Sequence, residues 1–214
     1  NSIDADSTKV EIRISHDCRN IRIADNGAGI HPDDIDIAFF KHTTSKISKY
    51  DDLWEISSFG FRGEALSSIT SISKLKCITK IDNCDYAVKV SFDDNGSLVK
   101  SKTVSNRGTI FEIEDLFYNV PARLKFLKNP KTEFSYIQEI VQQIALSNPQ
   151  VSILLTNDNK IALKTLGTGD LLSTIGELYS INISDNLLEV NNKDIFTKME
   201  LKGFISKPTF ERSS

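Results

Sequence analysis

Hydrophobic and polar residues alternate over several short segments of the chain, a pattern typical of half-buried β-strands. The first two predicted strands contain Val10, Ile12 and Ile14, and then Ile21 and Ile23. Turn-forming residues at Asp94-Asn95-Gly96 indicate a hairpin between two later strands. Further strands are expected at residues 75–81, 85–92, 98–104, 109–113, 151–156 and 161–164, and near Leu187 and Leu201.

Helical spacing of apolar residues marks the other elements. Phe134, Ile137, Val141 and Ile144 predict an amphipathic helix over residues 132–147. Shorter helices are expected at residues 64–72 and 171–179, after Pro32, and at the start of the chain. Strands in hairpins with separate helices predict an α+β fold and not a doubly wound parallel sheet. We expect one domain over residues 1–168 and the beginning of a second over residues 169–214.

Composition supports a packed intracellular protein. Of the 214 residues, 39% are hydrophobic and 26% are charged, which favours an ordered core. No apolar run reaches membrane-spanning length, and the start has no signal-peptide pattern. Cys18, Cys77 and Cys84 form no C-x-x-C pair, so we expect reduced thiols and no zinc site. Both ends are expected to lie inside a longer protein.

Asp25-Asn26-Gly27-Ala28-Gly29 is the first candidate for chemistry. The Asp25 carboxylate at the end of a strand could accept a hydrogen bond from the amine of adenine. Gly27 and Gly29 would let the backbone approach the base and sugar. The alternative, which this motif alone favours, is a glycine-rich turn in which Asp25 caps a nearby amide.

Three further segments carry residues suited to phosphate or metal. Gly60 to Leu66 runs from a loop into a helix, where backbone N–H groups could bind an anion; an ordinary helix cap is the alternative. Thr44, Ser45 and Lys46 are natural phosphate partners, although a solvated loop explains them equally well. Asn1 and Asp4 would share one face of the opening helix, and an Asn oxygen can bind Mg²⁺.

In their order along the chain, which starts at Asn1 and continues with Asp25, Thr44 and Gly60, these four elements resemble the ATP site of the GHKL superfamily, which contains gyrase, Hsp90, histidine kinases and MutL. Gly108-Thr109 at the start of a strand matches a fifth element. The segment from Leu116 to Leu127, with Tyr118-Asn119-Val120-Pro121-Ala122-Arg123 at its centre, resembles a MutL signature. The chain is therefore identified as similar to the MutL family of DNA mismatch-repair proteins, and the resemblance covers nearly all of it.

The resemblance implies a Bergerat-type sandwich, with a mixed sheet and helices on one face, followed by a second domain of βαβ type. It implies ATP and Mg²⁺ as cofactors, with Asn1 as the magnesium ligand and Asp25 as the adenine ligand. The family's general-base Glu would lie about one helical turn before Asn1 and its phosphate-binding Lys beyond Ser214, so no catalytic residue is assigned and residues 1–214 alone are expected to be inactive. The ATP-binding residues implied are Asn1, Asp25, Gly27, Gly29, Thr44, Ser45, Lys46, Gly60, Phe61, Arg62, Gly63, Glu64, Ala65, Leu66 and Thr109.

The resemblance also implies a slow ATP-driven clamp. ATP would order a lid and promote contact with a second MutL subunit, and the other partners would be a MutS-type mismatch sensor and DNA. The net charge of −3 makes any DNA contact local, through a basic stretch that a solvated surface also explains. We expect a cytoplasmic protein in a bacterium or a nuclear one in a eukaryote, with no membrane contact. The basic stretch comprises Arg123, Lys125, Lys128 and Lys131.

Two other functions are compatible with the same motifs. A type II topoisomerase ATPase region would have the same pocket but gives no reason for residues 117–127, and a strand-passage assay would distinguish it. A MutL-like subunit that binds nucleotide without hydrolysing it would lack the upstream Glu.

Overall fold

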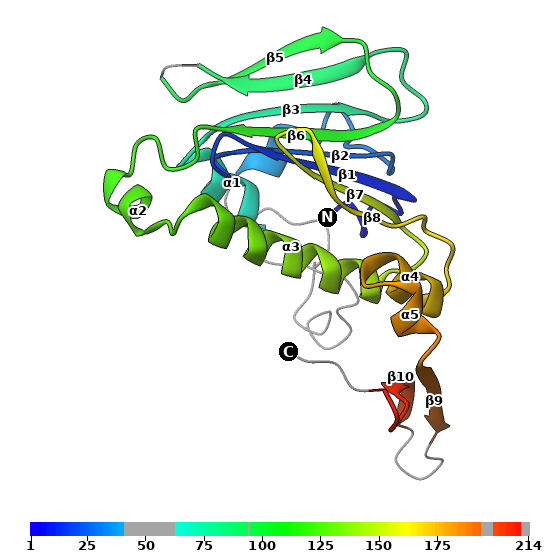
Figure 1. Cartoon of the computed structure of the whole chain (residues 1–214). Coiled ribbons are helices and arrows are strands. Elements are labelled where there is room, and N and C mark those ends of the chain that lie inside the picture. The colour runs from blue at the N-terminus through cyan, green and yellow to red at the C-terminus, as the bar shows by residue number, and fades with distance from the viewer. Residues whose placement is uncertain (41–62, 94, 194–198, 211–214) are drawn as a thin grey trace.

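An eight-stranded mixed sheet is the centre of the fold (Figure 1). The computed structural model describes residues 1–40, 63–93, 95–193 and 199–210. Neighbouring strands in the sheet are antiparallel except β1 and β7, which are parallel. The predicted α+β class is confirmed. In sheet order the strands are β5 (Leu98–Thr103), β4 (Ala87–Phe92), β3 (Lys74–Lys80), β6 (Gly108–Glu114), β2 (Asn20–Asp25), β1 (Lys9–Ser15), β7 (Ser152–Asn157) and β8 (Lys160–Lys164).

The alternation in the sequence sets which face of the sheet is buried. In β1, Val10 and Ile14 are buried while Arg13 between them is exposed. Because successive side chains point to opposite faces, the apolar residues of all central strands gather on one side. Charged residues such as Arg22 and Glu112, which are paired in the register of β2 and β6, lie on the other.

The helices cover the apolar face of the sheet (Figure 1). The longest helix, α3, has Pro130 as its first residue and Asn129 as its N-cap. The Asn129 side chain accepts a hydrogen bond from the Thr132 amide at 3.0 Å. A capping side chain of this kind contributes about 1 kcal/mol. The described helices are η1 (Ile37–Phe39), α1 (Ala65–Thr70), α2 (Pro121–Phe126), α3 (Pro130–Ser147), α4 (Leu171–Leu178) and α5 (Ile181–Ser184).

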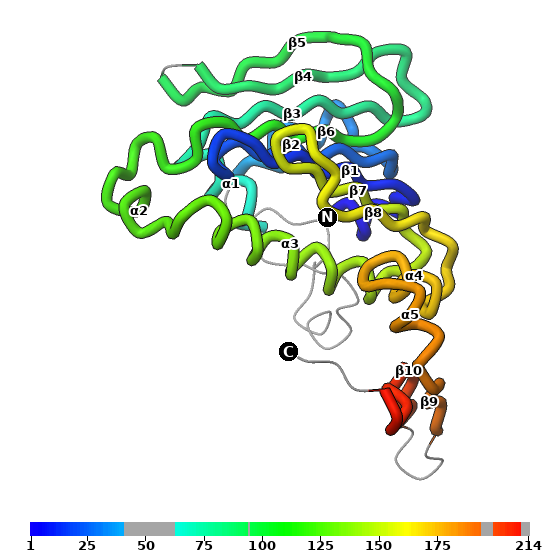
Figure 2. The backbone as a smooth tube through the Cα atoms, viewed as in Figure 1, coloured from blue at the N-terminus to red at the C-terminus, as the bar shows by residue number. Residues whose placement is uncertain are grey.

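Two core clusters lie under the two halves of the sheet. In one cluster, Val141 and Ala145 of α3 pack against the buried residues of β1, β7 and β8. In the other, Ile35 and Phe39 pack against β3, β4 and β6. The strand β2 lies between β1 and β6, so its end is held from both sides. Figure 2 shows that β1 and β7, far apart in sequence, run side by side, as their register requires.

Two helix predictions were wrong. The segment after Pro32 forms turns and then only the 3-10 helix η1, because three aspartates in residues 33–36 are poor helix formers. The first residues form a turn closed by a hydrogen bond from the Ala5 amide to the Asn1 carbonyl at 2.9 Å. Asp6, with φ of 55°, reverses the chain directly after this turn.

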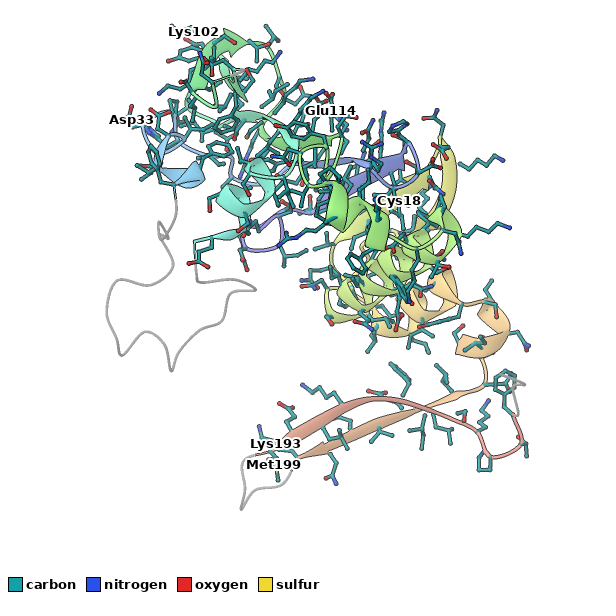
Figure 3. The ribbon with its side chains drawn as sticks, turned by 90° about the vertical axis from the view of Figure 1, so that its left-hand side faces the viewer. Cys18, Asp33, Lys102, Glu114, Lys193 and Met199 are labelled. Carbon is teal, nitrogen blue, oxygen red and sulfur yellow. The ribbon has the colours of Figure 1, made fainter. Side chains whose placement is uncertain are left out.

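The C-terminal part of the chain contains α4, which contacts α3 and β8, followed by α5 and an antiparallel hairpin. The hairpin consists of β9 (Leu187–Lys193) and β10 (Glu200–Ser206). Figure 3 shows it apart from the large sheet, with Lys193 and Met199 near one end. The division at residues 168 and 169, and a second domain of βαβ type, remain predictions. Within the described ranges, no helix is both long and apolar enough to cross a membrane.

Candidate nucleotide-binding site

Asp25 is the last residue of β2 and lies at the edge where β2, β6 and the N-terminal turn meet. It has the same orientation in the strand as Ile21 and Ile23, so its side chain points to the helix-covered face. Thr109 is the second residue of β6 and is buried. The two residues therefore face the same side of the sheet, as a shared ligand site requires.

Both oxygens of the Asp25 carboxylate accept hydrogen bonds within the protein. Oδ1 accepts from the Gly27 amide at 3.0 Å and from the Thr109 amide at 3.1 Å. Oδ2 accepts from the Ser2 hydroxyl at 2.7 Å. The two amides use only one oxygen, so Oδ2 keeps acceptor capacity beyond the Ser2 contact. The alternative that Asp25 caps a nearby amide is thus correct for Oδ1, and it is compatible with ligand binding at Oδ2.

The N-terminal turn packs directly on the loop after β2. The Ala28 amide donates to the Ala5 carbonyl at 2.9 Å. A Cβ atom at Gly27 would lie 2.6 Å from that same carbonyl oxygen, so only glycine allows this approach. The turn that begins at Asn1 is therefore fixed beside Asp25.

Asn26 connects the loop to the start of β1. Its side-chain oxygen accepts from the amides of Thr8 and Lys9 at 3.0 and 2.9 Å, and its amide group donates to the Thr8 hydroxyl at 2.8 Å. Each of its side-chain groups thus has a partner in the protein. Asn26 stabilises the loop and is not available as a ligand.

Glycines also close the other side of the loop. Gly29 has φ of 77°, and a Cβ atom there would lie 2.3 Å from the Lys80 carbonyl oxygen at the end of β3. Gly108 has φ of 118°, and its Cβ would lie 2.0 Å from the Asp25 carbonyl oxygen. Both conformations and both contacts exclude a side chain. The backbone around Asp25 is therefore packed on β3 and β6 without intervening side chains.

Buried residues of β3 lie behind the site, and the sequence analysis did not identify them. The Thr79 hydroxyl is within hydrogen-bond distance of the loop and of β6. Cys77 is fully buried, and burial together with the nearby Asp25 charge raises the pKa of its thiol to about 12. Their alternation with Lys76 and Ile78 predicts only that they face the core. Their proximity to Asp25 depends on a long-range register that the sequence pattern does not reveal.

The structure brings together Asn1, Asp25, Gly27, Gly29 and Thr109 of the predicted site. Gly63, with φ of 62°, and Glu64 precede α1, which begins at Ala65; Leu66 packs against the second core cluster. The helix α1 lies on the helix-covered face of the sheet (Figure 1), to which alternation along β2 directs the Asp25 side chain. The remaining predicted ligands lie outside the described residues: Thr44, Ser45, Lys46, Gly60, Phe61 and Arg62.

Two other polar regions lie elsewhere. A cavity of about 240 Å³ is lined by Arg13, Arg22 and Glu112, whose side chains point to the face of the sheet opposite Asp25. The basic stretch lies on α2 and the start of α3, where Arg123 and Lys125 are exposed. In the described part of the chain, no group of three or more His, Cys, Asp or Glu side chains is arranged to hold a metal ion.

Sequence comparison identifies the family to which this arrangement corresponds. Residues 1–120 match the family described as histidine kinase-, DNA gyrase B- and HSP90-like ATPase. The chain is 42% identical over 216 aligned residues to the DNA mismatch repair protein MutL of Clostridium botulinum (strain Kyoto / Type A2) and 38% identical over 215 to that of Lactobacillus delbrueckii subsp. bulgaricus. Each alignment covers 100% of this chain and 32% of the relative, so the chain spans about a third of these proteins.

Solved structures give the same correspondence. The Aquifex aeolicus MutL ATPase domain complexed with ADP has a TM-score of 0.75 and 28% identity, over 99% of this chain and 74% of that one. The N-terminal domain of a DNA repair protein has a TM-score of 0.80 and 31% identity, over 98% of this chain and 67% of that one.

Proposed function

The chain belongs to the histidine kinase-, DNA gyrase B- and HSP90-like ATPase family, in its MutL group, and on this premise we propose that it binds ATP for DNA mismatch repair. The similarity to MutL proteins extends over the whole chain, which makes the topoisomerase alternative unnecessary. The relative solved with ADP supports an adenine nucleotide as the ligand. The observation that carries the proposal is the Asp25 carboxylate held between β6 and the N-terminal turn.

Asp25 is suited to recognise the adenine base. Two backbone amides fix its Oδ1, so Oδ2 is presented in a defined position for a donor such as an exocyclic amine. The Ser2 hydroxyl that donates to Oδ2 can rotate to accommodate a ligand. Gly27 and Gly29 let the N-terminal turn and the end of β3 pack directly on the loop after β2, which holds Asp25 in a fixed position for the base.

Asn1 is proposed to hold Mg²⁺ through its side-chain oxygen. Magnesium prefers oxygen ligands and takes most of them from water and phosphate, so one protein amide fits its chemistry. The Asn1 side chain is 69% exposed, and the turn that Asn1 begins packs on the loop after Asp25. When bound, Mg²⁺ would neutralise phosphate charge.

Hydrolysis requires a base that positions and deprotonates water. We propose that this carboxylate is the family's Glu, about one helical turn before Asn1, and that the phosphate-binding Lys belongs to the second domain. The sequence also predicts that Thr44 to Lys46 and Gly60 to Leu66 contact phosphate and act as a lid. Most of these residues lie outside the described part, so the lid remains a prediction.

The proposed partners follow from the same family relationship. They are a second MutL subunit that associates when ATP is bound, a MutS-type mismatch sensor, and DNA, in the cytoplasm of a bacterial cell. The exposed Arg123 and Lys125, with Lys128 and Lys131, could contact the phosphate backbone. Lys128 already donates to the Tyr136 hydroxyl at 2.6 Å, so that contact would have to open.

Asp25→Asn tests the nucleotide site. An amide oxygen can still accept from Gly27 and Thr109, while the new amino group no longer accepts at the Oδ2 position. The variant should therefore fold, and calorimetry should show ATP affinity reduced about ten- to a hundredfold, which corresponds to about 1.5–3 kcal/mol for a charged hydrogen bond. Unchanged affinity in the folded variant would remove Asp25 from the site. ATP binding without turnover by the full-length protein would instead support a binding-only subunit.

A further inference from the structure

Thr79 connects three parts of the nucleotide site. It lies on β3, is 1% exposed, and is paired in register with Thr109 of β6. Its hydroxyl oxygen lies 2.8 Å from the Ile30 amide, 3.2 Å from the Gly108 carbonyl oxygen and 3.1 Å from the Thr109 hydroxyl. Ile30 directly follows the glycine loop, so this single hydroxyl contacts both the loop and the strand whose amide binds Asp25.

The number of available protons sets the direction of these hydrogen bonds. A hydroxyl has one proton to donate and two lone pairs to accept. The Ile30 amide donates to one lone pair of Thr79, and the Gly108 carbonyl, which can only accept, takes the Thr79 proton. Either hydroxyl can donate in the Thr79–Thr109 contact, and all three contacts are satisfied together only when Thr109 donates to the second lone pair of Thr79. The Thr109 proton is then used in a hydrogen bond within the protein, so the Thr109 hydroxyl can only accept a hydrogen bond from a ligand.

Resting on the proposed ATP-binding function, we propose that Thr79 is a positioning residue that makes Thr109 a hydrogen-bond acceptor in the base pocket. The pocket then presents acceptors from both Asp25 and Thr109. Such a pocket favours a base that carries an amino group and disfavours one with an oxo group in the same place. Thr79 would therefore contribute to selecting ATP over inosine triphosphate, without itself contacting the nucleotide.

Thr79→Val tests this role, because valine has nearly the same shape but no hydroxyl. In the variant, the Thr109 proton is free to donate to an oxo group, and the Ile30 amide loses its partner. In the full-length protein we expect ATP affinity to fall about tenfold. Affinity for inosine triphosphate should fall less, so the ratio of ATP affinity to inosine triphosphate affinity decreases. Thr79→Ser retains the hydroxyl and should have the wild-type affinity for ATP and for inosine triphosphate.

Thr165 provides a matched control. It is also 1% exposed, and its hydroxyl likewise accepts from a backbone amide, that of Ile153 at 3.0 Å, and donates to a carbonyl, that of Val151 at 3.3 Å. These contacts lie at β7 and the residue after β8, away from Asp25 in the sheet. Thr165→Val should therefore reduce stability in a similar way but leave the ratio of nucleotide affinities unchanged.

The outcomes separate the two proposals. If the wild-type protein binds neither nucleotide in calorimetry, the proposed function is wrong and the role of Thr79 falls with it. If the wild type binds ATP but folded Thr79→Val keeps the wild-type ratio, or Thr165→Val changes it equally, only the Thr79 proposal is overturned. If Thr79→Val does not fold, Thr79→Ala removes the same hydroxyl while leaving Thr109 intact, and it must narrow the ratio. A wild-type ratio in that variant would refute the proposal.

Discussion

Replacing Gly29 with alanine tests how tightly the loop after β2 is held against β3. Gly29 has φ of 77°, and Gly96 in the turn between β4 and β5 has φ of 76°. An alanine in this left-handed region costs about 1–2 kcal/mol at either position. No atom lies within 4 Å of a Cβ at Gly96, whereas a Cβ at Gly29 would lie 2.3 Å from the Lys80 carbonyl oxygen. Comparing Gly29→Ala with Gly96→Ala therefore separates the cost of the left-handed backbone, which both variants share, from the cost of the close contact with Lys80, which only Gly29→Ala has.

The contact at Gly29 adds a second cost. An ordinary separation of at least 3.4 Å requires the loop or the end of β3 to move by roughly 1 Å, since the present separation would be 2.3 Å. Such a shift would break the 2.8 Å hydrogen bond from the Ile30 amide to Thr79 and leave a buried donor, which costs about 1–3 kcal/mol. We expect Gly29→Ala to lose about 2–5 kcal/mol and Gly96→Ala about 1–2 kcal/mol.

Thermal unfolding followed by circular dichroism measures the difference. For a domain of this size, the expected decrease in Tm is about 6–15 °C for Gly29→Ala and about 3–6 °C for Gly96→Ala. Gly29→Ala should also weaken ATP binding, because the loop directly follows Asp25 and contains Gly27, whose amide donates to the Asp25 carboxylate. Equal decreases in Tm for the two variants would refute the reasoning that the loop is packed on the Lys80 carbonyl.

Two further predictions concern a buried thiol and the catalytic base. Because burial raises the pKa of Cys77 from 9.0 to about 12, the folded state keeps a proton that the unfolded chain releases as the pH rises through this range. Above pH 9 the free energy of unfolding should fall by up to about 1.4 kcal/mol per pH unit more in the wild type than in Cys77→Ala. Urea midpoints that change in parallel in the two proteins from about pH 8 to 10.5 would contradict this. Residues 1–214 expressed alone should bind ATP without releasing phosphate. If they hydrolyse ATP as fast as the full-length protein, the upstream Glu is not the base, and Asp4 or Glu64 becomes the candidate.

The strands of the sheet can be predicted from the sequence because the alternation that marks each strand involves only neighbouring residues. Alternation in residues such as Val10, Arg13 and Ile14 identifies the strands, and the observed bounds differ from the predicted ones by a few residues. The segment after Pro32 was mispredicted because a proline followed by acidic residues looks like a helix start. Its actual form depends on the burial of Ile35 and Phe39, which tertiary packing determines.

The candidate site was predicted only where a motif carries it. Asp25, Gly27, Gly29 and Thr109 were found by their resemblance to a family pattern, and the structure brings them together. Thr79 has no local signal, because a threonine in a strand is ordinary. Its importance arises from the register between β3 and β6, which joins residues far apart in the chain. Long-range pairing of this kind cannot be obtained from periodicity.

The parallel pairing of β1 with β7 has a consequence for synthesis on the ribosome. Lys9 pairs with Ser152, so β1 emerges long before its partner and remains an unpaired edge until residues 152–157 have been synthesised. The Asp25 carboxylate likewise cannot accept hydrogen bonds from both amides until Thr109 has been synthesised. Pairings this distant in sequence slow folding. The nascent chain therefore cannot complete its nucleotide pocket until β6 has been made, and cannot cover β1 until α3 and β7 have followed.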